Sequence, residues 1–403
     1  VAFSVRLHPP GNPLDEPLPG ELTTETIHVC VRGTPSQRRA SGESNLNNRV
    51  FRSIVLIGTC ALCLRPVQVQ AITLASASLA STHVKAFDDV TNAEIRSFLA
   101  FSTFTGGATV AAGDINNDNI PDIIVGTGPG AAHVKVFDGV SNAEIRSFLP
   151  FGSFTGGIFV GSGDITGDGV DDIIVGSNAP ATHVKVFDGV TNAEFRSFLP
   201  FGSSTAGVRV AAADVNGDGN ADIIVGTGVG AAHVKVFDGI TNAEIRSFLP
   251  FGSFTGGIFV GGGDINGDGV GDIYIGTDNA QAHIMVFDGQ TTAVLRSFLP
   301  FGTFGGGVRV AAADVNGDGK ADIIAGAGPG SGHMKVFDAV SNAELRSFFP
   351  FTGFTGGIYV GGLAASSITN PPPPTGGRFI PEPGTAILAM MCLGVAGARR
   401  RRI

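Results

Sequence analysis

Hydrophobic and polar residues recur along the chain with a period of 50 residues. The segment His-Val-Lys-Val-Phe-Asp begins at positions 133, 183 and 233, with variants at 83, 283 and 333. Ser-Phe-Leu-Pro-Phe begins at 147, 197, 247 and 297. A fixed period of this length indicates a repeat architecture, in which each unit buries its apolar face against the next.

Each repeat contains four short segments with the pattern of β-strands. In the third repeat these segments are residues 208–212, 223–226, 233–237 and 244–249. Alternating side chains, β-branched residues and turns of Gly, Asn and Asp favour strands over helices. Four antiparallel strands repeated radially make the blades of a β-propeller. A parallel β-helix is the alternative, although its rungs are usually shorter than this repeat.

The two ends of the repeat region complement each other. The last repeat stops after its first strand, at residues 357–361, and the first repeat begins near Ile72 with a degenerate second strand. The C-terminal strand can therefore complete the N-terminal blade and leave no open edge, whereas an open solenoid would need capping repeats. We predict an all-β propeller of six four-stranded blades, closed by pairing of the N- and C-terminal strands in one blade.

The repeat region, residues 72–362, is flanked by segments of different composition. Residues 1–49 are polar and aperiodic, and we interpret them as unstructured or as a leader that precedes the true start of translation. Residues 50–71 combine a basic start, a short apolar run and an exit of small residues, which is the pattern of a secretory signal peptide. A buried strand is the alternative there. Residues 363–380 form a Pro- and Gly-rich linker.

Residues 381–403 contain Pro381-Glu382-Pro383, an apolar segment over 384–398 and the cluster Arg399–Arg402. As a helix the apolar segment would cover about 22 Å, which is short of a ~30 Å hydrocarbon core. The combination resembles the PEP-CTERM sorting signal of exported Gram-negative proteins. The resemblance implies an exosortase-type sorting enzyme as a partner, transient membrane insertion through the tail, and delivery to the cell surface or extracellular matrix. An ordinary tail anchor is the alternative.

Composition and charge narrow the classes of function. The chain has 60 Gly, 30 Phe, 2 Tyr and no Trp, and so much glycine excludes a coiled coil. A net charge of −9 argues against nucleic acid as a partner, because phosphate contacts need clustered Lys and Arg. The four cysteines, at 30, 60, 63 and 392, lie outside the repeat region, which can therefore form neither a disulfide nor a Cys-ligated metal site.

Five repeats carry an acidic loop between their first and second predicted strands. Oxygen-bearing residues stand at loop positions 1, 3, 5 and 9, and Gly stands at position 6 in four of the five loops. Such oxygens suit Ca²⁺, position 7 offers a backbone carbonyl, and Gly permits the sharp turn. The predicted ligands are Asp114, Asn116, Asp118, Ile120, Asp122; Asp164, Thr166, Asp168, Val170, Asp172; Asp214, Asn216, Asp218, Asn220, Asp222; Asp264, Asn266, Asp268, Val270, Asp272; and Asp314, Asn316, Asp318, Lys320, Asp322.

Two loops depart from the pattern, and we expect weaker sites there: Asn119 replaces the glycine of position 6, and Thr166 replaces the asparagine of position 3. Position 12 is an apolar strand residue such as Val225, where an EF-hand has a bidentate Glu. The three aspartates of each loop would repel one another without a cation. Asx-rich turns without a metal are the alternative.

These strand-flanked loops, together with pairs such as Phe151-Gly152 and Phe251-Gly252, resemble the FG-GAP (VCBS-like) repeats of integrin α-subunit propellers. The resemblance covers residues 72–362. It implies a calcium-stabilised propeller of adhesive or scaffolding type, with up to five Ca²⁺. The closing blade departs from the family, since Gly361-Gly362-Leu363 stands where its loop would be.

We expect an exported, non-enzymatic protein for adhesion, scaffolding or matrix organisation, with an extracellular polysaccharide or a surface protein as its partner. A polysaccharide-active enzyme is one alternative, but near-identical repeats offer no asymmetric set of groups for catalysis. A lectin is the other, and the scarcity of Trp and Tyr for sugar stacking weighs against it. The repeated histidines are interpreted as packing or hydrogen-bonding residues rather than a metal-binding ring; they are His83, His133, His183, His233, His283 and His333.

Overall fold

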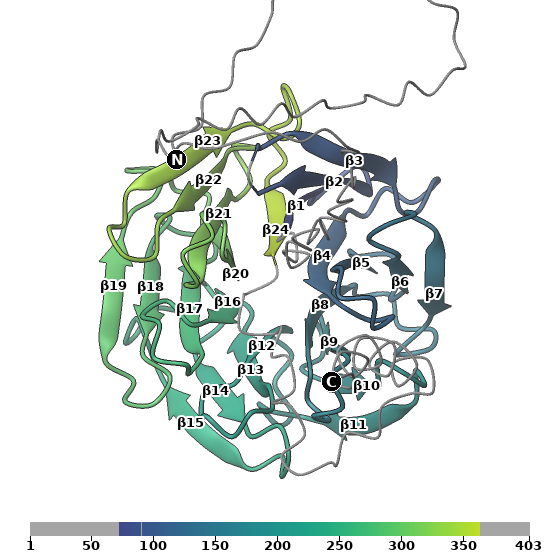
Figure 1. Ribbon diagram of the computed structural model, residues 1–403, viewed down its shortest axis with the longest axis horizontal. Coiled ribbons are helices and arrows are strands. Elements are labelled where there is room, and N and C mark those ends of the chain that lie inside the picture. The colour runs from purple at the N-terminus through teal and green to yellow at the C-terminus, as the bar shows by residue number, and fades with distance from the viewer. Residues whose placement is uncertain (1–71, 90, 363–403) are drawn as a thin grey trace, which may run out of the picture. The chain divides into compact units, whose positions relative to one another are not determined.

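Six antiparallel sheets of four strands each stand around a common centre in the computed structural model (Figure 1). The structure describes residues 72–89 and 91–362. The prediction of an all-β propeller with six four-stranded blades is confirmed. The proposed leader, signal peptide, linker and sorting tail lie outside the described residues. The described part of the chain holds no helix that could cross a membrane.

Five blades are continuous in sequence, and we number them in chain order. Blade 1 contains β4 (Ala108–Gly113), β5 (Asp122–Thr127), β6 (Val134–Phe137) and β7 (Glu144–Phe148). Blade 2 contains β8 (Ile158–Gly163), β9 (Asp172–Ser177), β10 (Val184–Phe187) and β11 (Glu194–Phe198). Blade 3 contains β12 (Val208–Ala213), β13 (Asp222–Thr227), β14 (Val234–Phe237) and β15 (Glu244–Phe248). Blade 4 contains β16 (Ile258–Gly263), β17 (Asp272–Thr277), β18 (Ile284–Phe287) and β19 (Val294–Phe298). Blade 5 contains β20 (Val308–Ala313), β21 (Asp322–Ala327), β22 (Met334–Phe337) and β23 (Glu344–Phe348).

The closing blade joins the two ends of the repeat region. Its strand order is β24 (Ile358–Gly362), β1 (Ile72–Ala77), β2 (His83–Asp88) and β3 (Glu94–Leu99). The strands β24 and β1 pair antiparallel, with Ala75 opposite Val360. The predicted closure by the terminal strands is confirmed, and this pairing leaves no inner strand of the ring without a neighbour.

The position of a strand within its blade explains its composition. First strands contact the first strands of both neighbouring blades and surround the central channel, so small residues such as Ala211 and Ala212 fit there. Second strands are buried on both faces, and Ile223, Ile224 and Val225 of β13 are fully covered. A strand covered on both faces reads as a continuous apolar run. Fourth strands at the rim contain exposed and half-buried residues and no fully buried ones.

Pairs of phenylalanines hold each blade to the next. The last residue of a third strand packs against a Phe of the preceding fourth strand, as Phe237 does against Phe198 with ring centroids 4.9 Å apart. Such a pair adds about 0.5–1.5 kcal/mol beyond the burial of its area. The same contact between Phe87 and Phe348, at 4.9 Å, joins the closing blade to blade 5. The ring is therefore closed by side chains as well as by strand pairing.

The repeated histidines pack and donate or accept hydrogen bonds within these joints. In blade 1, Nε2 of His133 lies 2.8 Å from Oγ of Ser147. The imidazole also packs against Phe101 of the preceding connector, with centroids 5.1 Å apart. Burial lowers the pKa of His133 below its ordinary value. All six histidines repeat the contact with serine, which agrees with a packing and hydrogen-bonding role.

One position of the first strands breaks the repeat at the centre of the ring. Phe159, Phe259 and Tyr359 come from alternate blades, and their ring centroids are 5.9–6.1 Å apart. Arg209 and Arg309 stand on the blades between them and stack over these rings at 4.8–5.4 Å. Small residues line the rest of the channel, which encloses a cavity of about 530 Å³.

Candidate metal sites

The five acidic loops all connect a first strand to a second strand, as the sequence predicts. In blade 3 the loop follows β12 and ends on Asp222, the first residue of β13. Gly217 and Gly219 take positive φ values of 77° and 92°. In blade 1, Asn117 and Asn119 adopt the same conformation, at 61° and 62°, because asparagine accepts the left-handed region better than most residues. The replacement of Gly by Asn in blade 1 therefore preserves the backbone path.

The aspartate at loop position 1 organises the turn. In blade 3, Oδ1 of Asp214 accepts hydrogen bonds from the N–H groups of Gly217 at 2.7 Å and Asp218 at 3.2 Å. Its Oδ2 accepts one from the N–H of Gly219 at 2.8 Å. The same pattern recurs in the other loops, for example at Asp314. A carboxylate that accepts several backbone N–H groups fixes the loop around itself.

The aspartate at loop position 9 is buried at the start of the second strand. Asp222 is 0% exposed, and its oxygens accept hydrogen bonds from the N–H groups of Val215 at 3.0 Å and Gly239 at 2.8 Å. Burial is the main cause that raises the pKa of this carboxyl to about 7, with a contribution from the charges of Asp218 and Asp214. No ion pair of the described residues involves Asp222.

The other four loops repeat this buried, unpaired carboxyl. Burial raises the pKa to about 7 for Asp122 and Asp272, and to about 6 for Asp172 and Asp322. Neighbouring loop aspartates contribute in each case, because like charges disfavour ionisation. A bound cation would counteract both the cost of burying the negative charge and the repulsion between the aspartates, and it would therefore lower these pKa values.

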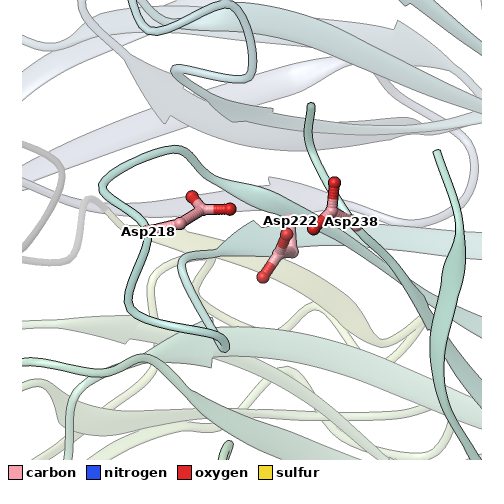
Figure 2. Close-up of side chains that lie close together, drawn as sticks. All are labelled: Asp218, Asp222 and Asp238. Carbon is pink, nitrogen blue, oxygen red and sulfur yellow. The ribbon is translucent and has the colours of Figure 1, made fainter. Parts of the chain in front are cut away.

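Three carboxylates converge at the loop of blade 3. Asp218, Asp222 and Asp238 have ligand oxygens within 4.8 Å of one another (Figure 2). Among the described residues this is the one group of three acidic, His or Cys side chains that meets this criterion. Three carboxylates that converge in this way, without Cys or His, suit a hard cation such as Ca²⁺.

Asp238 is absent from the predicted ligands. It follows β14, and its Oδ1 caps the turn after this strand by accepting the N–H of Thr241 at 2.6 Å. Its Oδ2 accepts a hydrogen bond of 3.0 Å from Nδ2 of Asn216 in the acidic loop. The available signal was the recurrence of Asp at the same place in every repeat, at 88, 138, 188, 288 and 338.

The predicted ligands do not all converge in this structure. Asp214 is bonded to the loop backbone and lies outside the group of three. At position 3, Nδ2 of Asn266 donates to Oδ2 of Asp268 at 3.0 Å, so this amide bonds to a fellow predicted ligand. At position 7, the N–H of Asn220 donates to Oδ1 of Asp218 at 2.9 Å, and only the carbonyl of that residue is offered as a ligand. The predicted ligand atoms are all oxygens, which is the ligand type that Ca²⁺ prefers.

Adjacent loops are joined by backbone hydrogen bonds. The carbonyl of position 1 in one loop accepts the N–H of position 8 in the next blade, as Asp164 does from Ala221 at 2.8 Å. In blade 2, position 8 is Asp171, whose buried carboxylate also accepts the N–H of Asp114 at 2.9 Å. Burial raises the pKa of Asp171 to about 7. The five loops thus form a continuous chain from blade 1 to blade 5.

Known families match both the repeats and the tail. A family described as FG-GAP-like repeat matches residues 150–225 and 264–325, and the FG-GAP repeat matches residues 106–137. The PEP-CTERM protein-sorting motif matches residues 379–402. The chain is therefore a six-bladed propeller of FG-GAP repeats that carries a PEP-CTERM sorting signal, as its resemblances predicted. These two features indicate an exported protein that an exosortase-type system recognises.

Solved structures are similar to parts of this chain at low sequence identity. A protein of unknown function from Bacteroides caccae has a TM-score of 0.49 and 10% identity, over 73% of this chain and 99% of that one. Raptor from Chaetomium thermophilum has a TM-score of 0.44 and 16% identity, over 75% and 24%. A chain of the Mitotic Checkpoint Complex has a TM-score of 0.43 and 11% identity, over 69% and 75%. No curated protein matches the chain.

Proposed function

We propose that this exported propeller is a non-enzymatic, calcium-binding scaffold for adhesion or matrix organisation at the cell surface or in the extracellular matrix of a Gram-negative bacterium. The observation that carries the proposal is the chain of five acidic loops, each with a buried and unpaired carboxyl at position 9. An uncompensated buried charge is costly, and a divalent cation is the simplest partner for it.

Each loop would hold Ca²⁺ through residues of its own. In blade 3 these are the side chains of Asp214, Asn216, Asp218 and Asp222 and the carbonyl of Asn220, which supply only oxygen. The carboxylate of Asp238 converges with those of Asp218 and Asp222 and adds its charge to this site. The bound cation supplies charge neutralisation and a fixed coordination geometry. Affinities on the order of 10⁻⁴–10⁻³ M are typical of extracellular modules and would keep the sites filled outside the cell.

The links between loops suggest what calcium achieves. Because the carbonyl of Asp164 accepts the N–H of Ala221 in the next loop, order in one loop restrains its neighbour. A metal that fixes several loops would therefore stiffen the joints between blades. A rigid disc with many near-identical edges is suited to presenting a repeated surface to a polysaccharide or a surface protein.

An enzymatic role has less support. The repeats are nearly identical, and the first strands that surround the channel are dominated by Ala, Gly and Val. Catalysis needs groups with different pKa values gathered at one place. The five position-9 carboxyls instead share one environment and similar pKa values, of about 6 to 7.

The proposal is tested by calcium stoichiometry and melting of the full chain. We expect up to five bound Ca²⁺ in equilibrium dialysis, and a lower Tm in excess chelator, because each site filled at 100 times its Kd adds about 2.7 kcal/mol. Magnesium should replace calcium poorly, since it demands a tighter octahedral geometry. Absence of bound calcium with identical melting in chelator would refute the proposal. Calcium-dependent attachment of protein-coated beads to extracellular matrix tests adhesion, and turnover of a polysaccharide panel would establish the enzymatic alternative.

A further inference from the structure

One connector between blades differs from the others at an aromatic position. The connectors run from each fourth strand to the next first strand, and five of them carry a phenylalanine there: Phe104, Phe154, Phe254, Phe304 and Phe354. Each of these rings packs against a second Phe three residues earlier, with centroids 5.9–6.4 Å apart. The connector between blades 2 and 3 has Ser204 instead.

The aromatic ring of Phe304 occupies part of a groove between blades. Phe304 lies against Gly330, where a Cβ would come within 3.3 Å of Cε2 of the ring. The groove that includes Phe304 has a volume of about 310 Å³. The corresponding groove beside Ser204 has a volume of about 710 Å³. The exchange of Phe for Ser thus accompanies a groove of more than twice the size.

Polar groups with unused hydrogen-bonding capacity line the larger groove. They come from both blades and the connector, and include Asn178, Ser204, Thr205 and Arg209. The side chains of Asn178 and Thr205 make no hydrogen bond to the rest of the described chain. No Asp or Glu is among the described residues that line this groove. The groove therefore offers hydrogen bonds and no repulsion to an anion.

Arg209 brings a buried positive charge to this groove. The residue is only 7% exposed, and its Nη2 donates to Oδ2 of Asp278 at 3.0 Å. Its Nε and Nη1 atoms are buried and have no hydrogen-bond partner, whereas in Arg309 the same holds for Nε alone. Arg309 is 6% exposed and lies 4.0 Å from the same Asp278. Two buried guanidinium groups thus share one carboxylate, which leaves one positive charge uncompensated within this cluster.

Blade 5 offers an internal comparison. Arg309 occupies the position of Arg209, but its Nη1 donates to the carbonyl of Gly306 at 3.4 Å. Arg309 does not line the smaller groove beside Phe304. Among the described grooves, the one beside Ser204 therefore combines a large volume with a buried guanidinium that has free N–H groups.

We propose that the groove beside Ser204 binds a small hydroxylated anion of the sugar-acid class, such as a uronate. Its carboxylate would accept a charge-assisted hydrogen bond from Nη1 of Arg209, which is the strong type of polar contact. Asn178 and Thr205 would bond to its hydroxyl groups. The site is separate from the acidic loops and does not depend on what those loops bind.

Titration calorimetry on the full chain in calcium buffer tests the site, with glucuronate as the probe and glucose as its neutral control. We expect saturable binding of glucuronate at one site and at least about tenfold weaker binding of glucose, because the carboxylate carries the recognition. No heat of binding with millimolar glucuronate, or equal binding of the two sugars, would overturn the proposal.

A matched double variant fills the groove with the sequence of the other blades. Ser204→Phe is combined with Ala206→Gly, since a Cβ at the equivalent Gly106 would come within 2.5 Å of Cζ of Phe104. Five connectors already carry this Phe and Gly combination, so the variant should melt at the same temperature or higher. We expect it to lose glucuronate binding by at least about tenfold. Unchanged affinity in a folded variant would show that the ligand does not bind in this groove.

The reverse exchange is the second control. Phe304→Ser alone should open the groove beside this residue, where Arg309 has a partner for its Nη1. Gly306 is kept, because a Cβ there would come within 2.2 Å of the carbonyl oxygen of Pro329. We expect this variant to keep a single glucuronate site. A second site of equal affinity would overturn the assignment of anion recognition to the unpartnered Nη1 of Arg209.

Discussion

The carbonyl of Asp214 accepts a hydrogen bond of 2.6 Å from the N–H of Gly271, and these two residues belong to the acidic loops of neighbouring blades. Equivalent bonds of 2.7–2.9 Å join the other successive loops. A ligand of one loop is thus bonded directly to the loop that follows. A substitution that disturbs one calcium site is therefore expected to affect the next site. Single-site variants are best compared by both their calcium stoichiometry and their free energy of unfolding.

The first prediction concerns the position-5 ligand of blade 3. Asp218→Ala should remove one calcium equivalent, because the exposed carboxylate belongs to the group of three that converges there. In chelator the variant should lose less than about 1 kcal/mol, since exposed substitutions away from buried networks have small effects. Equilibrium dialysis and melting curves measure the two quantities.

The control for this variant removes an equal charge from the same blade. Glu244 forms an exposed ion pair with Lys235 at 2.7 Å, and such pairs contribute little. Glu244→Ala should leave calcium stoichiometry unchanged. If both variants bind as much calcium as the unmodified chain, Asp218 is not a ligand.

The second prediction concerns the residue that the sequence pattern did not identify. Asp238→Asn keeps an oxygen that can accept the N–H of Thr241, so the turn should survive. The loss of the charge should weaken calcium binding at the third site by roughly 10- to 100-fold, the range found when groups that support a metal site are removed. Melting in chelator should be nearly unchanged. If the variant binds calcium with unchanged affinity at all sites, Asp238 serves only to cap the turn.

The third prediction tests how the ring closes. Ala75 lies opposite Val360 in the pairing of β1 with β24, and both belong to one buried cluster. Ala75→Cys with Val360→Cys should form a disulfide, identified by mass spectrometry of the linked peptides. Because the bridge would enclose nearly the whole propeller, oxidation should raise the free energy of unfolding by about 2–4 kcal/mol.

The reduced double variant and the single variant Ala75→Cys are the controls for closure. Neither should gain stability in the oxidising buffer. A double variant that folds and stays reduced would contradict the strand pairing.

Local sequence patterns were sufficient to predict the strands of the blades and the positions of the acidic loops. The predicted strands of the third repeat differ from β12, β13, β14 and β15 by one residue at most at each end, since turn residues and buried apolar runs mark them locally. The complementary ends of the repeat region likewise predicted the pairing of β24 with β1.

Features that depend on contacts between distant segments could not be predicted in this way. Asp238 reaches the loop of Asp218 only because β14 lies beside β13. The bond from Gly271 to Asp214 needs two blades side by side. Ser204 departs from the repeat in the sequence, but the consequence of this departure depends on the guanidinium of Arg209, which lines the same groove. Each of these relationships comes from packing rather than from residue spacing.

The last prediction concerns a buried acid of the closing blade. Asp89 is 4% exposed, accepts a short hydrogen bond from the hydroxyl of Thr73 and lies 3.5 Å from Nη1 of Arg346. Burial outweighs both contacts and, with the nearby charge of Asp88, raises the pKa of Asp89 to about 6. The unfolded chain has its ordinary value of 3.8. The folded state therefore favours the protonated acid.

The sign of the pH dependence follows from this order of pKa values. The stability that protonated Asp89 contributes is fully present below pH 3.8 and is lost as the pH rises through about 6. Asp89→Asn is neutral at every pH, so it should gain on the order of 2–3 kcal/mol relative to the unmodified chain between pH 4 and pH 7. Denaturant unfolding at both pH values, in saturating calcium so that the loops stay constant, measures this difference. A variant that loses stability relative to the unmodified chain as the pH rises would show that the ion pair with Arg346 outweighs burial.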